Sequence, residues 1–278
     1  RLGEATTDGY TLVTPEHPGQ LLVHVHPDPA ELGRVYRTDL AICADPSEFA
    51  ESAMLWDDPD LAPFSVGAQA HREWLDWSSP VADPRFRLDM AECMAIARRL
   101  LPADTIICNG AGNFSGWWHR YWRYHGYPSQ LAPTAGAMGY GLPAAVAAAL
   151  RFPNRTVVAV AGDGDFQMNG QELATAAQQG ADLLVIVVDN GALGTIRMHQ
   201  EREFPGRVSA TALANPDFAA LAAAYGAWSS RVETTADFAA ALERALARKG
   251  LRLLHCVTDI EQLSAGGLTV SGLRTRKA

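Results

Sequence analysis

GDGDFQMNGQELATAAQQGADLLVIVVDNGALG, residues 162–194, is the stretch that decides the fold class of this chain. An apolar run at 156–161 leads into its first glycine, and a second apolar run, 183–188, lies within it. Both runs are apolar on both faces, which is typical of strands buried in a parallel sheet. Residues 171–179 between them predict a helix. The order strand, helix, strand indicates a doubly wound α/β domain.

The same alternation of helical and extended patterns continues on both sides of this stretch. The further expected helices are 88–101, one entered through Leu142 and Pro143, 217–225 and 235–248. The further expected strands are 105–108, 228–232 and 251–257. The sequence therefore predicts an α/β fold, a doubly wound and mostly parallel sheet with helices on both faces.

The first 55 residues indicate a partial second α/β domain. Its expected elements are two short strands, 21–25 and 40–43, and one helix, 46–54. They are too few to close a sheet alone, so we interpret 1–55 as the C-terminal remnant of a central α/β domain. Residues 56–86, rich in Asp and Pro and without periodicity, predict an interdomain linker, and a new domain is expected over 87–278. Because the chain begins with Arg1 and not Met, we expect it to be part of a longer protein.

Composition excludes several classes of function. The net charge of −8 argues against a nucleic-acid surface, and no apolar run approaches the roughly 20 residues that a membrane span needs. We therefore expect no nucleic acid or membrane among its partners, and a small-molecule substrate instead. The four cysteines lie far apart, which predicts neither a zinc site nor a disulfide framework and favours a reducing cytoplasm.

Polar residues follow both strands of the opening stretch, at the strand ends where ligands of doubly wound sheets bind. Gly162 and Gly164 flank Asp163 and permit close backbone approach by a diphosphate. Asn190 follows the next strand. Mg²⁺ prefers oxygen ligands, which a carboxylate, an amide oxygen and one loop carbonyl would supply. The alternative is that Asp163 and Asn190 only shape tight turns, but their positions on successive buried strands favour the metal interpretation.

The stretch 162–194 closely resembles the GDG-to-Asn signature of thiamine diphosphate enzymes in the acetohydroxyacid (acetolactate) synthase and pyruvate oxidase superfamily. The resemblance extends upstream to GAMGYGLPAA, residues 136–145, and covers about residues 87–260 as the diphosphate-binding domain. The segment HVHPDPAELGRVYRTDLAICADPSEF, residues 24–49, looks like the end of that superfamily's central domain.

The resemblance implies roles for individual residues. Asp163, Asn190 and the carbonyl of Ala192 would hold Mg²⁺. Met138 would support the bent thiamine diphosphate, although filling the core is the alternative for this side chain. The other implied cofactor contacts, from the diphosphate to the pyrimidine ring, are Gly112, Asn113, Phe114, Gly136, Gly162, Gly164, Asp165, Gly194 and Thr195.

The turn GAGNFSG, residues 110–116, has a competing interpretation as a dinucleotide fingerprint. Ser115 stands where the third glycine belongs, and no acidic residue between Asp104 and Asp163 could hold a ribose hydroxyl. These departures argue against a NAD-dependent dehydrogenase. In the resembled family the same turn faces the diphosphate.

The aromatic and histidine residues of the chain are ambiguous. The aromatic cluster between 114 and 127 could line a substrate pocket, but we favour a subunit interface. The histidines lack partners at metal or catalytic spacing, which predicts surface or interface positions. The residues concerned are Phe114, Trp117, Trp118, Tyr121, Trp122, Tyr124, Tyr127, His119, His125 and His199.

The resemblance implies an enzyme of 2-oxo acids, and acetolactate synthase-like carboligation of pyruvate is the leading interpretation. Thr195 and His199 stand where acetohydroxyacid synthases usually have methionine and tryptophan, so a benzoylformate decarboxylase-like or glyoxylate carboligase-like enzyme is the alternative. A catalytically dead cofactor-binding module is the non-enzyme alternative.

The residue that starts catalysis in the resembled family is expected outside this chain. It is a glutamate on the pyrimidine-binding domain of another subunit, and no segment here resembles its motif. We therefore expect the isolated chain to be inactive and the complete site to form in a homodimer or homotetramer. FAD is a possible further cofactor of the parent enzyme.

Overall fold

The computed structural model describes residues 3, 7–56 and 65–275, and its contacts divide the chain into two units, 1–68 and 69–278. Within the predicted linker, residues 57–64 lie outside the described residues, as do 276–278 of the expected cofactor domain and 1, 2 and 4–6 of the N-terminal segment. In the part of the chain that is described, no helix is both long and apolar enough to cross a membrane.

The first unit is a small α/β arrangement. Strands β1 (Val23–His26) and β2 (Leu40–Cys43) pair in parallel, and helix α1 (Pro46–Met54) follows them. The side chain of Asp45 accepts a hydrogen bond from the backbone N–H of Ser47, and proline opens the first turn, so the helix begins where this capping sequence stands. Strand β1 begins two residues later than the sequence predicts.

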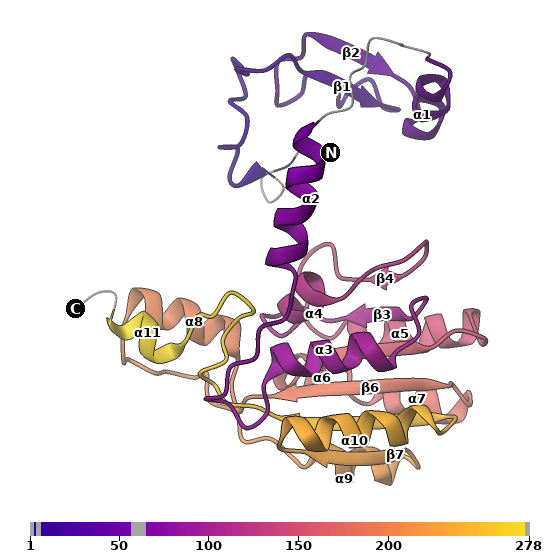
Figure 1. The fold of residues 1–278 in the computed structure, drawn as a ribbon, viewed down its shortest axis with the longest axis vertical. Helices are drawn as coiled ribbons and strands as arrows, with labels where there is room; N and C mark the ends of the chain where they lie inside the picture. Colours follow the sequence, from indigo (N-terminus) through magenta and orange to yellow (C-terminus); the bar gives the residue numbers. More distant parts are fainter. Residues whose placement is uncertain (1–2, 4–6, 57–64, 276–278) are drawn as a thin grey trace. The chain divides into compact units, whose positions relative to one another are not determined.

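The second unit contains a parallel sheet of six strands in the order β4, β3, β5, β6, β8, β7 (Figure 1). The strands are β3 (Ile106–Asn109), β4 (Gln130–Leu131), β5 (Val157–Gly162), β6 (Leu183–Asp189), β7 (Trp228–Val232) and β8 (Leu251–Val257). From β3 the chain runs first to β4 on one side and then to β5 on the other. The strand order therefore reverses between β3 and β5, and the predicted doubly wound fold is confirmed.

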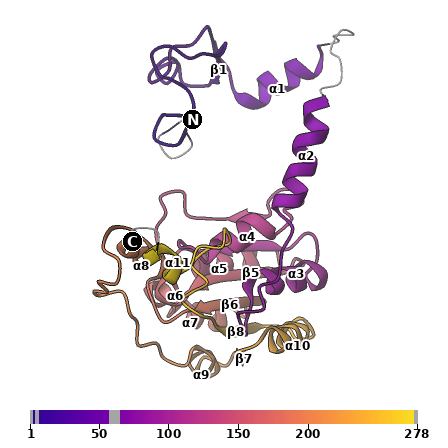
Figure 2. The same ribbon diagram turned by 60° about the vertical axis from the view of Figure 1, so that its left-hand side comes forward.

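Helices cover both faces of this sheet (Figures 1 and 2). The helices on one face are α3 (Met90–Leu100), α4 (Ser115–Tyr121) and α10 (Thr235–Leu246). Those on the other face are α5 (Gly141–Arg151), α6 (Asp163–Asn169), α7 (Glu172–Gln178) and α9 (Phe218–Ala224).

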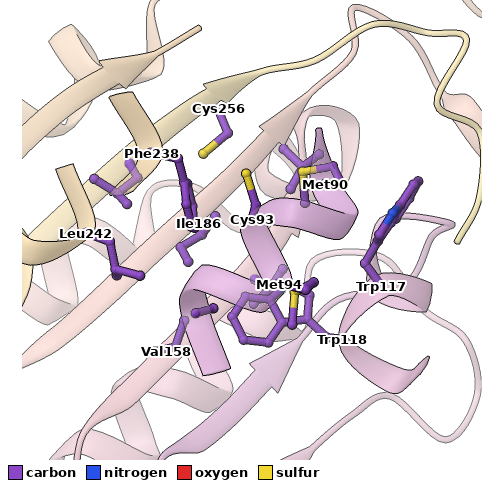
Figure 3. Close-up of a cluster of buried hydrophobic side chains, with 14 of the residues drawn as sticks. Met90, Cys93, Met94, Trp117, Trp118, Val158, Ile186, Phe238, Leu242 and Cys256 are labelled. Atoms are coloured by element: carbon purple, nitrogen blue, oxygen red, sulfur yellow. The ribbon is translucent and has the colours of Figure 1, made fainter. Parts of the chain in front are cut away.

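Alternate residues of each central strand pack into opposite cores. Leu184 and Ile186 of β6 face the first layer of helices, and Val185 and Val187 face the second. All four are almost completely buried. Figure 3 shows the first layer, in which methionine, cysteine and tryptophan side chains of α3 and α4 lie over the strands. Burying one such aliphatic side chain contributes about 1.5–3 kcal/mol, so the apolar strands hold the sheet in place.

Helices α8 (Gly194–Glu203) and α11 (Val270–Thr275) lie together beside the sheet (Figures 1 and 2). Arg274 of α11 makes two hydrogen bonds to the buried carboxylate of Glu201 on α8, at 2.8 and 3.0 Å. Arg197 donates to the same carboxylate at 2.8 Å, and the backbone N–H of Gly206 completes its shell. Arg274 thus joins the last described helix to α8, and Arg197 holds the shared carboxylate from within α8.

The sequence patterns do not predict every helix that the structure contains. Helix α2 (Ser65–Trp77) lies in the predicted linker, and α4 lies in the aromatic stretch. The guanidinium group of Arg123 stacks over the ring of Trp74 at 4.0 Å, and that of Arg120 over Trp77 at 4.8 Å. Helix α2 is stabilised by these distant contacts. Its apolar positions were obscured in the sequence by the Asp- and Pro-rich residues around it.

Candidate functional site

A cavity of about 290 Å³ lies at the carboxyl ends of β3, β5 and β6, where the strand order reverses. This is where ligands of doubly wound sheets bind. Every residue that the sequence predicts as a cofactor contact lines it. These residues are Gly112, Asn113, Phe114, Gly136, Met138, Gly162, Asp163, Gly164, Asp165, Asn190, Ala192, Gly194 and Thr195.

The Asp163 side chain is held at the start of α6, directly after β5, and is almost fully buried. One oxygen, Oδ1, accepts the backbone N–H of Gly164 at 2.9 Å. The other, Oδ2, accepts the backbone N–H of Ala192 at 3.1 Å and the amide Nδ2 of Asn215 at 2.7 Å. Burial raises the pKa of Asp163 to about 6, against the opposing effect of the hydrogen bonds from Asn215 and Gly164.

The structure brings Asn190 and Ala192 beside Asp163. The same backbone N–H of Ala192 also lies 3.1 Å from Oδ1 of Asn190, so the carboxylate and the amide oxygen converge on one group. Ala192 pairs with Ala212 in an antiparallel bridge whose hydrogen bonds come from the flanking residues. In such a pair the N–H and C=O of the central residue both face away from the partner segment. The carbonyl of Ala192 therefore lies on the same side as Asp163.

These three groups form a set of hard oxygen donors, which suits Mg²⁺ better than a transition metal. Among the described residues, no group of three or more His, Cys, Asp and Glu side chains is placed to hold a metal. A metal in this cavity would consequently depend on the amide and carbonyl oxygens as much as on Asp163. The donor set therefore fits the metal that the sequence resemblance implies.

Asp165 braces the cavity wall. Its Oδ1 accepts the backbone N–H groups of Ala111 at 3.0 Å and Gly139 at 2.8 Å, and thus ties two separate loops to α6. A Cβ atom added at Gly110 would lie 2.0 Å from Oδ2 of Asp165, so only glycine fits there. Burial raises the pKa of Asp165 to about 6. The carboxylate faces protein amides, which gives it a structural task whether or not it also contacts a diphosphate.

The loop after β3 is fastened to the start of α8. The backbone N–H of Asn113 donates to Oγ1 of Thr195 at 2.9 Å. The ring of Phe114 lies against the backbone of Gly162, where an added Cβ atom would approach it to 2.7 Å. A glycine at the end of β5 therefore lets the loop after β3 close over the strand end.

Met138 and Gly136 form another part of the wall. Met138 is 38% exposed, so it does not fill the core, and its side chain lines the cavity. Gly136 has φ +67°, a left-handed conformation that favours glycine. The Met138 side chain thus follows a turn in which any residue other than glycine at position 136 would be strained.

Several lining residues were not predicted from the sequence. They come from α3, α4, β6, α8, the loops after β3 and β6, and the segment after β8. Only those next to a predicted residue could have been found from the sequence. The unpredicted lining residues are Met90, Ala111, Trp117, Val188, Leu193, Ile196, Thr258, Gln262 and Leu263. Among all the described lining residues there is no Lys, Arg or His, so an anionic ligand would have to be neutralised by a metal ion and by backbone N–H groups.

The aromatic stretch does not form a subunit interface as a whole. Trp117, Trp118, Tyr121 and Trp122 are each 5% exposed or less within this single chain. They pack into the first core, and Trp117 also lines the cavity. The interface interpretation is therefore wrong for these four side chains, because the helical period of α4 places them on the side that faces α3 and the sheet. Tyr127, in contrast, is 99% exposed.

The histidines expected at surface or interface positions, His119, His125 and His199, are all exposed.

A polar network lies next to the cavity and was missed by the sequence patterns. The Nδ2 atom of Asn215 donates to Asp163 and also to Oδ1 of Asp189, at 2.7 Å in each case. His255, at the end of β8, places Nε2 2.8 Å from Oδ2 of Asp189. Asn215 lies 52 positions after Asp163, and its only local signal is that of a turn before α9.

Comparisons with known proteins show the family of the domain that contains this cavity. The model of the family described as thiamine pyrophosphate enzyme, C-terminal TPP binding domain, matches residues 110–256. The chain is 31% identical over 256 residues to the acetolactate synthase isozyme 2 large subunit of Escherichia coli (strain K12), covering 87% of this chain and 44% of that protein. It is 29% identical over 245 residues to the acetolactate synthase large subunit of Corynebacterium glutamicum, covering 82% and 38%. The chain thus spans less than half the length of these relatives.

Proposed function

The chain belongs to the thiamine pyrophosphate enzymes, whose C-terminal cofactor-binding domain it contains, and on this basis we propose that it anchors thiamine diphosphate through Mg²⁺. Asp163, Asn190 and the carbonyl of Ala192 would hold the metal. The observation that carries the proposal is the convergence of the Asp163 and Asn190 oxygens on one backbone N–H. The absence of basic side chains from the described cavity wall adds support, since a diphosphate there needs a metal cation.

The proposed reaction begins with a 2-oxo acid and is most similar to acetolactate synthesis from pyruvate. When bound, the cofactor would supply the electron sink that decarboxylation of a 2-oxo acid requires. The residues of this chain would bind and orient the cofactor. The oxygen donors would fix its diphosphate end through the metal, and the Met138 side chain, which lines the cavity, would support it by apolar contact. The similarity to acetolactate synthase large subunits supports the acetolactate reaction over those of other members of the superfamily.

A benzoylformate decarboxylase-like or glyoxylate carboligase-like reaction is the second candidate, and it rests on Thr195. This residue lines the cavity, at a position where acetohydroxyacid synthases usually have methionine. Its hydroxyl is already engaged by the backbone N–H of Asn113. The second departure, His199, is exposed and does not line the cavity, so it gives the alternative no support.

We further propose that the site is completed by the pyrimidine-binding domain of another subunit, in a homodimer or homotetramer. Apolar side chains around the cavity are partly exposed: Met138 by 38%, Tyr140 by 37% and Ile196 by 48%. A partner domain would cover them. Binding of FAD by the parent enzyme stays a prediction.

Substrate assays of the full-length parent protein test the reaction, because this chain alone is expected to be inactive. Supplied with thiamine diphosphate and Mg²⁺, the parent protein should form 2-acetolactate from pyruvate, with slower conversion of benzoylformate and glyoxylate. Faster turnover of either alternative substrate would favour the second candidate. Cofactor binding without turnover of any 2-oxo acid would favour the catalytically dead module, and no Mg²⁺-dependent binding of thiamine diphosphate would contradict the proposed function itself.

A further inference from the structure

We propose that Asn215 is a positioning residue that holds the Asp163 carboxylate in its metal-binding orientation. This inference rests on the proposed function, because it assumes that Asp163 contacts the metal. Asn215 does not line the cavity. It acts through its hydrogen bond to the Asp163 carboxylate, which does line the cavity.

The first step of the argument is the placement of one amide between two carboxylates. The NH₂ group of Asn215 donates to Oδ2 of Asp163 and to Oδ1 of Asp189, each at 2.7 Å. An amide has two N–H donors and can serve both acceptors at once. Asp163 and Asp189 follow neighbouring strands, β5 and β6, so Asn215 joins the two strand ends where the proposed metal ligands stand.

The second step is that Asp189 is itself fixed. Its Oδ1 also accepts the backbone N–H of Gly191 at 2.9 Å, and its Oδ2 lies 2.8 Å from Nε2 of His255. His255 is only 1% exposed. Asp189 therefore gives Asn215 a rigid support on the side away from the cavity.

The third step concerns the orientation of the Asn215 amide. Nε2 of Gln167 donates to Oδ1 of Asn215 at 2.9 Å, so the oxygen faces Gln167 and the NH₂ group faces the carboxylates. The backbone near Asn215 is also tied to the ligand loop. Leu213 donates its N–H to the carbonyl of Gly191 at 2.8 Å, and Leu193 donates to the carbonyl of Thr211 at 2.9 Å.

Loss of the Asn215 amide would leave two neighbouring carboxylates without their shared donor. Like charges repel, and Asp163 would be free to turn toward Ala192 and Gly164 alone. Mg²⁺ demands near-octahedral geometry at short distances, whereas Ca²⁺ accepts longer and more varied distances. A misplaced carboxylate should therefore weaken Mg²⁺ binding more than Ca²⁺ binding.

The test is the metal concentration that half-saturates binding of thiamine diphosphate by the purified protein, followed through tryptophan fluorescence, with Mg²⁺ and with Ca²⁺. Asn215→Leu keeps the branched shape of the side chain and removes the amide. We expect its half-saturating Mg²⁺ concentration to rise about 10-fold to 100-fold, the usual range for residues behind a metal ligand, and that for Ca²⁺ to rise less. Gln167→Leu, an exposed substitution that frees the amide to turn, should change Mg²⁺ binding in the same direction by a smaller factor.

Gln200→Leu is the matched control. Gln200 hydrogen-bonds to Ser209 and Thr211 and so braces the same loop, but touches neither carboxylate. Its half-saturating Mg²⁺ concentration should stay near that of the wild type. An unchanged value in Asn215→Leu, an equal loss for both metals, or the same loss in Gln200→Leu would overturn the proposal. If the wild type itself shows no metal-dependent binding, the proposed function fails first, which is a distinguishable result.

Discussion

The bodies of strands β5 and β6 and their carboxyl ends are equally buried but are built differently. Val158 and Leu184 in the bodies have no exposed surface, and their side chains lie in the first apolar core. Asp163 and Asp189 at the ends are 3% and 8% exposed, and hydrogen bonds surround them. Burial of apolar groups is favourable by itself, whereas a buried carboxylate needs specific donors. The bodies therefore set stability, and the ends have the arrangement suited to binding.

The largest expected effect comes from removing the carboxylate after β5. Asp163→Ala should weaken Mg²⁺-dependent binding of thiamine diphosphate about 1,000-fold or more, roughly 4 kcal/mol, because the only charged donor is lost. Titration calorimetry measures it. Asp182→Ala is the control at the opposite end of β6, where Asp182 pairs with Arg252 and Lys249. Equal loss of binding in both variants would remove the distinction between the two strand ends.

A substitution in a strand body should have the converse effect. Leu184→Ala leaves a cavity in the first core and should lower the free energy of unfolding by about 3 kcal/mol. Cofactor affinity of the protein that remains folded should change little. Urea unfolding with and without cofactor measures both quantities, and Leu150→Ala on α5, where Leu150 is 48% exposed, is the near-neutral control. A Leu184→Ala protein of normal stability would contradict the assignment of the core.

Glu201 on α8 is a buried carboxylate that lies away from the strand ends. We expect its charge to contribute to the free energy of unfolding and not to cofactor binding. Hydrogen bonding from Arg274 in the first place, with further help from Gly206 and Arg197, lowers the pKa of Glu201 to about 2. The stabilisation should be complete above the ordinary pKa of about 4.5 and be lost as the pH falls toward 2. Glu201→Gln should cost about 2 kcal/mol at pH 7. Urea unfolding at several pH values should show this difference shrinking below pH 4, and a difference independent of pH would contradict the ion-pair assignment.

The smallest effect is expected at the cavity wall. Met138→Ala should weaken binding of thiamine diphosphate by about tenfold, close to 1.4 kcal/mol, through lost apolar contact. Its melting temperature should stay unchanged, because Met138 is partly exposed. Met168→Ala on α6 is the matched control, since Met168 is 50% exposed and does not line the cavity. Parallel losses in the two variants would argue against a specific role for Met138.

The fold could be predicted from sequence wherever burial leaves a local pattern. The strand expected at 183–188 is observed as Leu183–Asp189, and the helix expected at 217–225 as Phe218–Ala224. Continuous apolar runs and the helical period are properties of neighbouring residues, so they can be read locally. Helix α8 has no such pattern, because polar residues dominate it. The pattern of α2 was obscured by the Asp- and Pro-rich sequence around it.

The candidate site was predictable in part for the same reason. Glycine and acidic residues that directly follow an apolar run can be located in the sequence. The parallel sheet then places these strand ends next to one another. No local pattern connects Asn215 or His255 to Asp189, because their proximity arises from the order of the strands and the path of a loop. Gln262 likewise reaches the cavity from beyond β8. Residues that support a site from distant segments need the three-dimensional arrangement.

The lack of basic side chains in the described cavity wall has a thermodynamic consequence. If the diphosphate and the metal neutralise each other there, neither should bind well alone, and each should raise the affinity for the other by the same factor. The buried carboxylates strengthen this coupling, because Asp163 without a cation would repel the diphosphate. The cavity would then remain almost empty when either component is scarce, and its occupancy would follow the product of their concentrations.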